Sequence, residues 1–141
     1  MKTNSIRIIC IVLFAAACAP CRWAHAEDAV HVIEFTADSD SRYKMAGQRV
    51  PEITVKAGEQ ILLRVTANKG KTWNRDGSIH GFTLLRAKDR KKVEGWDLLF
   101  KPGQQEIALT APSEPGEYEV VCTVICSEDH EGMHMKFTVL P

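Results

Sequence analysis

The sequence predicts an all-β domain, built as a sandwich of mainly antiparallel strands. Short runs that alternate apolar and polar residues recur at intervals of about 10 residues. Pro-Gly pairs such as Pro102-Gly103 and Pro115-Gly116 separate several of these runs. No apolar pattern with helical spacing extends beyond about two turns. Runs and breaks of this kind favour a sandwich over a parallel sheet with crossover helices.

The first segment, residues 1–26, has the layout of a secretory signal peptide. Lys2 and Arg7 precede the apolar run 8–17, and small residues lead to Ala26, after which cleavage is expected. The apolar run is shorter than the roughly 20 residues needed to span a bilayer as a helix. We therefore expect export to the periplasm.

The mature domain is expected to span residues 27–141 and to have no transmembrane segment. The chain has 18 basic and 18 acidic residues, and the leader contains only basic ones, so the mature domain is mildly acidic. This balance excludes a basic nucleic-acid binder. A lipid anchor on Cys18 is the less favoured alternative, because the leucine usual at the start of such a signal is missing.

The predicted strands follow the alternation along the chain. Residues 30–36 alternate clearly and 50–55 more weakly, and the turn 56–59 leads to the run 61–65, which predicts a hairpin. A polar loop, 68–78, comes next. Further strands are expected at 79–85, 106–109, 118–124 and 136–140.

A cluster of soft metal ligands lies near the carboxyl end. Cys122 and Cys126 are the two cysteines of the mature domain, and with His130 and Met133 they form the motif C-x3-C-x3-H-x2-M. A disulfide across so short a loop would remove little unfolded-state entropy. Thiolate, imidazole and thioether together favour copper, since calcium and magnesium prefer oxygen ligands and zinc rarely uses a thioether.

One further ligand is expected from outside this loop. His80 follows the polar loop and opens the apolar run 81–85, which places an imidazole at the mouth of a strand. In a sandwich, this strand end and the cysteine loop can lie at the same end of the molecule. His31 has no comparable context.

These residues resemble a cupredoxin domain of the CuA type. The resemblance rests on the pattern from Pro51 to Gly58, on Ser78-Ile79-His80-Gly81-Phe82 and on the terminal C-x3-C-x3-H-x2-M motif, and it covers residues 30–141. The terminal motif is the specific part, whereas other copper and non-copper proteins share the first pattern. Domains of this type occur in cytochrome c oxidase subunit II and in nitrous oxide reductase. The resemblance implies a cupredoxin-like Greek-key β-sandwich or barrel.

The resemblance also implies a binuclear copper centre. Both thiolates bridge two copper ions, each imidazole caps one ion, and a thioether and a backbone carbonyl are weak ligands. Subunit II commonly has Glu at the carbonyl position, where its side chain also reaches a magnesium site; the valine found here departs from that pattern. The implied metal-binding residues are His80, Cys122, Val124, Cys126, His130 and Met133.

Such a centre implies a one-electron carrier that is not itself an enzyme, with a cytochrome or a terminal oxidase or reductase as its redox partner. An acidic group flanks the ligands and is interpreted as solvated, or alternatively as steering a basic partner. The aromatic stretch and membrane helices of subunit II are not reproduced, so membership of an oxidase complex does not follow. Trp73 and Trp96 are expected to be packing or loop residues. The acidic group is Glu128, Asp129 and Glu131.

Three alternatives remain open from the residues. A periplasmic copper chaperone or store would bind Cu(I) through Cys122, Cys126 and Met133, with Met135 or His134, and deliver it to an oxidase. A mononuclear blue-copper carrier would omit Cys122. Thiol–disulfide exchange is weaker, because C-x3-C lacks the C-x-x-C context that lowers a thiol pKa. The blue-copper set would be His80, Cys126, His130 and Met133.

Overall fold

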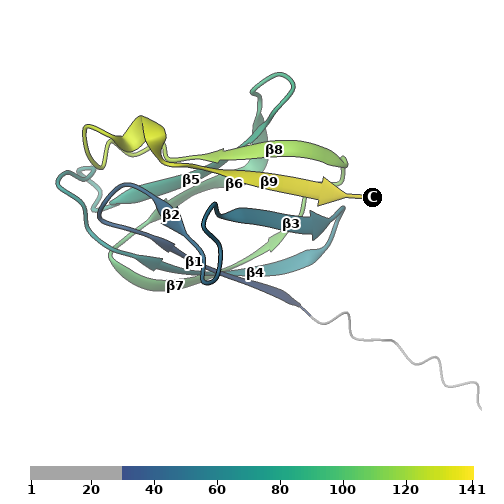
Figure 1. Cartoon of the computed structure of the whole chain (residues 1–141), viewed down its shortest axis with the longest axis horizontal. Coiled ribbons are helices and arrows are strands. Elements are labelled where there is room, and N and C mark those ends of the chain that lie inside the picture. The colour runs from purple at the N-terminus through teal and green to yellow at the C-terminus, as the bar shows by residue number, and fades with distance from the viewer. Residues whose placement is uncertain (1–29) are drawn as a thin grey trace, which may run out of the picture.

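The computed structural model describes residues 30–141, in which nine strands form two packed sheets (Figure 1). The predicted signal peptide and Cys18 lie outside these residues. The first sheet has the strand order β2-β1-β4-β7 and the second β3-β9-β8-β5-β6. The first sheet comprises β1 (His31–Ala37), β2 (Tyr43–Lys44), β4 (Gln60–Ala67) and β7 (Gly103–Thr110). The second comprises β3 (Glu52–Lys56), β5 (His80–Arg86), β6 (Lys92–Phe100), β8 (Gly116–Val121) and β9 (His134–Leu140).

The predicted all-β sandwich is confirmed, and side-chain alternation explains the strands. In β4, Ile61, Leu63 and Val65 are buried, and the residues between them are partly or fully exposed. Period-two burial of this kind places one face of the sheet against the core. In contrast, the first six residues of β5 are all buried, so this strand is buried on both faces.

Aromatic rings fill the centre between the sheets. Phe82 on β5 is fully buried, with ring centroids 5.4 Å from Phe35, 6.0 Å from Tyr43 and 6.1 Å from Phe100. Trp96 packs beside this group and is 3% exposed, as expected for a packing residue. The cluster packs β5 against the first sheet and so fixes the position of the strand that begins with His80.

Two strand pairings differ from the antiparallel expectation. β1 pairs with β4 in parallel, and β3 pairs with β9 in parallel. The predicted hairpin between the second and third segments is wrong, because β3 and β4 belong to different sheets. The turn 56–59 crosses between the sheets, and its Ala57 N–H donates to the carbonyl of Leu140 on β9. The chain therefore returns to the first sheet in the direction of β1.

The structure also adds two strands and shortens another. β2 has two residues and gives no usable alternation. β6 is an edge strand with many exposed residues, and Gly95, at φ +78°, interrupts its pattern. β8 ends at Val121 rather than at residue 124, because the chain leaves the sheet to form the loop that carries the cysteines.

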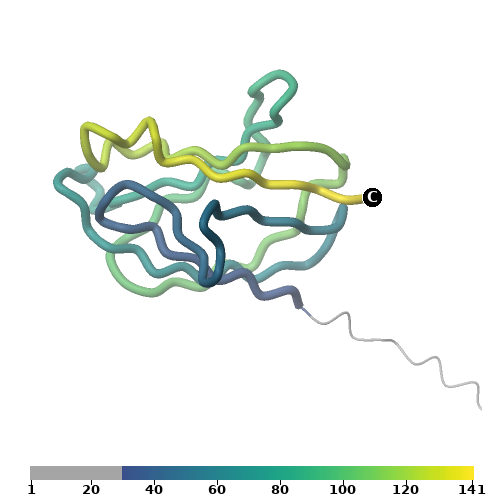
Figure 2. The backbone as a smooth tube through the Cα atoms, viewed as in Figure 1, coloured from purple at the N-terminus to yellow at the C-terminus, as the bar shows by residue number. Residues whose placement is uncertain are grey.

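The loops at one end of the sandwich gather the candidate ligands. The loop between β8 and β9, which we call the ligand loop (122–133), lies beside the loop 68–79 that leads into β5 (Figure 2). The ligand loop contains the short 3-10 helix η1 (His130–Gly132). β1 begins and β9 ends at the opposite end of the molecule (Figure 1). Among residues 30–141, no helix has the length and apolar character needed to cross a membrane.

Candidate metal centre

The pairing of β5 with β8 brings the two predicted ligand segments together. These strands are antiparallel, with Thr83 opposite Val121, so the start of β5 lies beside the end of β8. His80 is the first residue of β5, and Cys122 is the first residue after β8. A backbone register fixed by sheet hydrogen bonds therefore sets the distance between an imidazole and a thiol that are far apart in the sequence.

Three of the predicted ligands form a compact buried group. One ligand atom from each of His80, Cys122 and Cys126 lies within 4.8 Å of the others, and the three residues are 0%, 8% and 0% exposed. The two Sγ atoms are 3.9 Å apart, far beyond the roughly 2.05 Å of a disulfide, so both cysteines are thiols. Two metal–thiolate bonds of about 2.3 Å can bridge this separation. Both sulfurs can therefore bind a common ion.

The hydrogen bonding of His80 leaves one ring nitrogen available. Nε2 lies 2.8 Å from the backbone carbonyl of Asn68, and since a carbonyl can only accept, Nε2 carries the proton. Nδ1 is then an acceptor, yet it is buried and has no hydrogen-bond partner. Burial lowers the pKa of His80, which favours the neutral ring. An oriented neutral imidazole with a free lone pair is the form that binds a metal.

His130 repeats part of this pattern. Its Nδ1 is also buried and has no hydrogen-bond partner. The residue begins η1, and its backbone carbonyl accepts a hydrogen bond from the N–H of Met133. His130 lies outside the compact group of three. The described residues thus contain two buried imidazole nitrogens without partners, and both belong to predicted ligands.

Met133 and Val124 each lie against one of the thiols. The Sδ atom of Met133 is 4.0 Å from the Sγ atom of Cys126, and Met133 is 1% exposed. The backbone oxygen of Val124 lies 3.3 Å from the Sγ atom of Cys122. The Val124 side chain itself is fully buried. Each cysteine sulfur therefore has a further potential metal ligand beside it, a thioether in one case and a carbonyl oxygen in the other.

The environment of Cys122 favours the protonated thiol when no metal is bound. Burial raises the pKa of this thiol to about 11, and a hydrogen bond from the Gly81 N–H, 3.2 Å from Sγ, opposes the shift. A bound metal ion would supply the positive charge that stabilises the buried thiolate after the proton leaves. The site thus has the donors of a metal centre in an environment that penalises free thiolate.

The loop 68–72 holds both ligand segments, a role that no pattern in the sequence indicates. The Thr72 N–H donates to the carbonyl of Cys126 at 3.2 Å, and its Oγ1 donates to the carbonyl of Ile125 at 2.6 Å. Asn68 binds His80 through its carbonyl, as described above. A Cβ added at Gly70 would lie 2.8 Å from the Cys126 oxygen, so glycine permits the close approach. Because backbone groups make most of these contacts, they leave little pattern in the side chains.

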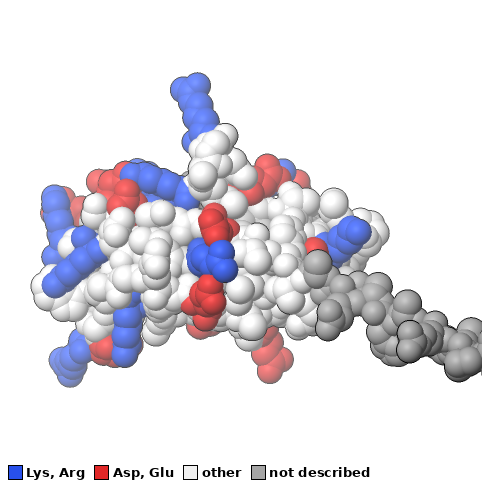
Figure 3. All heavy atoms as spheres, turned by 90° about the horizontal axis from the view of Figure 1, so that it is seen from below, with Lys and Arg blue, Asp and Glu red and all other residues white. Residues whose placement is uncertain are grey.

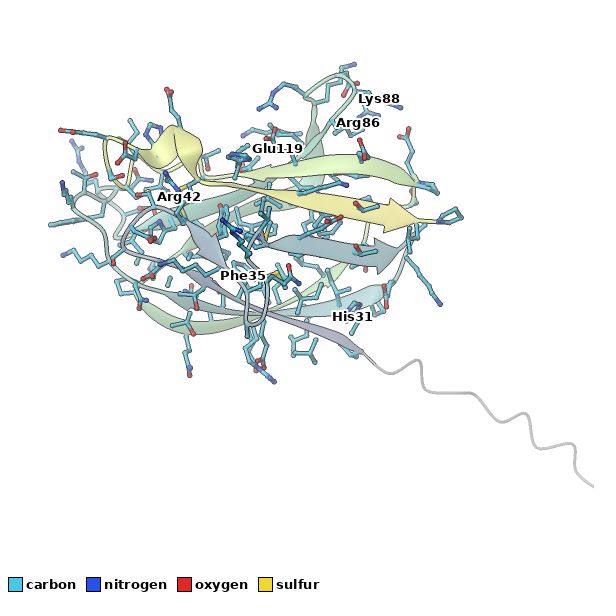
Figure 4. All side chains as sticks on the ribbon, viewed as in Figure 1. His31, Phe35, Arg42, Arg86, Lys88 and Glu119 are labelled. Carbon is cyan, nitrogen blue, oxygen red and sulfur yellow. The ribbon has the colours of Figure 1, made fainter. Side chains whose placement is uncertain are left out.

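A second unpredicted contact comes from the loop between β1 and β2. The Oγ atom of Ser41 is 3.4 Å from the Sγ atom of Cys126 and 2.6 Å from the Oγ atom of Ser127. The adjacent Arg42 lies beside the ligand loop (Figure 4) and donates to the carbonyl of Asp129 at 3.4 Å. Neither residue has a sequence context that indicates a metal site.

The two loops at the site expose both apolar and charged side chains. Ile125, between the two cysteines, is 65% exposed, and Trp73 on the neighbouring loop is 52% exposed. The Nζ atom of Lys69 lies 3.5 Å from the centre of the Trp73 ring. The three acidic residues of the ligand loop are exposed, as expected for a solvated group. Lys and Arg side chains also gather at this end (Figure 3). The loop 68–79 carries three exposed basic residues, Lys69, Lys71 and Arg75.

The additional residues considered for a copper store lie on β9. His134 is exposed, and its Nδ1 is 3.5 Å from a carboxylate oxygen of Glu119. Met135 is 2% exposed and belongs to the hydrophobic core. His31, at the start of β1, lies 3.2 Å from the carboxylate of Glu59.

The fold is cupredoxin-like, and solved structures share it. A chain of a heme-copper terminal oxidase dimer has a TM-score of 0.54 at 15% identity, over 82% of this chain and 68% of that chain. Reduced auracyanin from the photosynthetic bacterium Roseiflexus castenholzii has a TM-score of 0.51 at 23% identity, over 80% and 99%. Auracyanin A, a "blue" copper protein from Chloroflexus aurantiacus, has a TM-score of 0.51 at 18% identity, over 77% and 98%. Identities this low establish the fold alone.

Comparison at the level of sequence gives no relative. No protein-family model matches the chain, and no curated protein matches it.

Proposed function

We propose that the protein is an exported copper protein that carries one electron at a time. The observation that supports this most directly is the buried group of His80, Cys122 and Cys126, in which a ring nitrogen of the histidine lies within 4.8 Å of both thiols. The Nδ1 atom of this histidine has no hydrogen-bond partner. Met133 adds a thioether at 4.0 Å from one thiol. Thiolate, imidazole and thioether together are the donor set that copper prefers.

Electron transfer is favoured because the ligands are held by rigid elements. His80 is anchored by β5 and by the Asn68 carbonyl, and the ligand loop is closed by the Cys122 N–H, which donates to the Met133 carbonyl at 3.1 Å. Ligands fixed in this way change position little when the metal gains or loses an electron. The nearly complete burial of the donors also limits access by substrates. We therefore infer a carrier, not an enzyme in its own right.

Within this function, we propose a binuclear centre in which both cysteines bridge two copper ions. The arrangement of the potential ligands supports this proposal, because they form two similar sets. Each thiol has one weak donor beside it, the Val124 carbonyl for Cys122 and the Met133 thioether for Cys126. Two buried imidazoles, rather than one, have a free Nδ1. Two copper ions bound there would share one electron between them.

A mononuclear blue-copper centre is the second candidate. Cys126 is fully buried and contacts Met133, and a blue-copper centre needs one cysteine, two histidines and a weak axial methionine. In that case Cys122 would be a buried thiol beside the metal. A Cu(I) store is less favoured, because His134 faces Glu119 and Met135 packs in the core.

The electron partner is proposed to be another redox protein, such as a cytochrome or a terminal oxidase or reductase. Ile125 lies between the two cysteines in the sequence and is 65% exposed, so a partner that covers it would be close to the copper ligands. The charged residues around this position would influence how fast the partner approaches, an effect that weakens with salt.

The number of copper ions is tested by a pair of matched variants, Cys122→Ser and Cys126→Ser. Anaerobically loaded protein is analysed for copper per chain and by electron spin resonance. Two bridged ions predict two copper atoms per chain and seven hyperfine lines, and both variants should lose this signal. A blue-copper centre predicts one atom, four lines, and loss in Cys126→Ser alone. Wild-type protein that retains no copper after gel filtration would refute the proposed function.

Export is proposed from the leader and has its own test. Expression of the full chain in a bacterium should yield a periplasmic protein whose amino terminus is Glu27. Recovery of uncleaved chain from the cytosol, or of lipid on Cys18 in the membrane fraction, would contradict cleavage after Ala26.

A further inference from the structure

Ser41 is held in an unusual conformation next to a thiol. It is 0% exposed and has φ +58°, in the left-handed region that non-glycine residues rarely adopt. The turn is closed by two hydrogen bonds, from the Ser41 N–H to the Asp38 carbonyl at 3.0 Å and from the Asp38 N–H to the Arg42 carbonyl at 2.9 Å. The loop therefore fixes where the Ser41 hydroxyl lies.

The hydroxyl belongs to a short chain of hydrogen bonds that ends at Cys126. The Asp129 N–H donates to the Oγ atom of Ser127 at 3.1 Å, and Ser127 lies 2.6 Å from the Oγ atom of Ser41. Ser41 in turn lies 3.4 Å from the Cys126 sulfur. A metal-bound thiolate has no proton to donate, so Ser41 must be the donor to the sulfur. Ser41 can then accept from Ser127, and each hydroxyl in the chain donates once and accepts once.

We infer that Ser41 is a positioning residue that donates a hydrogen bond to the Cys126 thiolate and thereby raises the reduction potential of the copper centre; this rests on the proposed function. A hydrogen bond draws electron density from the sulfur, so the thiolate donates less to the metal. Cu(II) depends on that donation more than Cu(I) does, and the reduced state is favoured. Hydrogen bonding around a cysteine sulfur is one of the factors that set copper potentials.

The inference holds for either number of copper ions, because Cys126 is a ligand in both candidate centres. The two thiols also differ in a useful way. Cys122 receives its hydrogen bond from the backbone N–H of Gly81, which no substitution other than proline removes. Among the described residues, Ser41 provides the hydroxyl group that is hydrogen-bonded to a cysteine sulfur. The bond to Cys126 can therefore be removed without changing a ligand.

Two substitutions separate the hydrogen bond from the backbone strain. Ser41→Gly removes the hydroxyl and relieves the positive φ, whereas Ser41→Ala removes the hydroxyl and keeps the strain. Both should lower the potential to a similar extent, and Ser41→Gly should be the more stable variant. We expect about a tenfold shift of the reduced-to-oxidised ratio at a fixed applied potential, which is about 59 mV for one electron. The sulfur-to-copper charge-transfer band should move to lower energy in both.

Ser39→Ala is the control, because Ser39 lies in the same loop and is exposed. It should leave the potential and the band unchanged, while Ser127→Ala should give a smaller shift than Ser41→Gly. Wild-type protein that loads copper, together with Ser41→Gly that loads it with an unchanged potential and band, would overturn this inference and leave the proposed function standing. Wild-type protein that takes up no copper would overturn the proposed function and this inference with it.

Discussion

Gly81 lets the start of β5 approach the ligand loop, and adding one methyl group there tests that arrangement. A Cβ at this position would lie 2.6 Å from the Oγ1 atom of Thr123 and 2.8 Å from its backbone nitrogen. Since ordinary contacts to a Cβ begin at 3.4 Å, the two backbones must separate by about 0.6 Å. This movement also lengthens the hydrogen bond from the Gly81 N–H to Cys122. We expect Gly81→Ala to lower the free energy of unfolding by about 1–3 kcal/mol.

The assay is thermal unfolding of the metal-free mature domain, followed by the spectrum of the copper-loaded protein. A loss of this size should lower Tm by about 4 °C or more in a domain of this length. Gly95→Ala is the matched control. A Cβ at Gly95 meets no atom within 4 Å, and its positive φ alone should destabilise the protein by about 1–2 kcal/mol. Its copper spectrum should match the wild type, whereas that of Gly81→Ala should shift. An unchanged Tm and spectrum in Gly81→Ala would refute the reasoning.

Other perturbations test the core, acid stability and metal uptake. Phe82→Ala should destabilise the domain by about 3–5 kcal/mol in urea unfolding, because the ring is fully buried among aromatic neighbours; a loss below about 1 kcal/mol would contradict that packing. A hydrogen bond from Lys44, together with others, holds the pKa of the Asp38 carboxyl well below its ordinary value. The carboxylate therefore stabilises the fold fully at a pH above its unfolded pKa of about 3.9, and this stabilisation is lost as the pH falls toward the folded pKa. Asp38→Asn should therefore flatten the decline of Tm between about pH 5 and pH 3, and an unaltered slope would contradict this. Because burial raises the pKa of Cys122 to about 11, copper uptake at neutral pH should release at least one proton, measurable by calorimetry in two buffers, and acid should release copper; full copper content at about pH 4 would contradict it.

Much of the fold followed from the sequence, because buried strands leave a pattern of period two. Seven strands appear within a few residues of their predicted positions, and the loop between the last two carries the cysteines as expected. The errors concern pairing and edges. Alternation shows that residues 50–55 and 61–65 are strands, but it does not show which sheet each one joins. β6 was missed because it is an edge strand with many exposed residues and because Gly95 interrupts it.

The candidate site was predictable to the extent that its donors are side chains with specific chemistry. Cys122, Cys126 and Met133 form a recognisable spacing, and His80 opens an apolar strand; the structure places these four residues together. Their role as metal ligands stays a prediction. The supporting contacts could not be foreseen, because those of the loop 68–72 use mainly backbone groups. The contact from Ser41 depends on a turn whose conformation no local pattern indicates.

The positions of the start of β1 and the end of β9 have a practical consequence. β1 begins and β9 ends at the pole opposite the ligand loop (Figure 1). A linker attached after Pro141 would consequently anchor the domain with its cysteine-bearing pole directed outward. Tethered through that terminus to a gold electrode, the molecule would present Ile125 to the solution and leave it open to soluble proteins. The same orientation would suit fusion to a larger assembly, since neither attachment point competes for the face nearest the sulfurs.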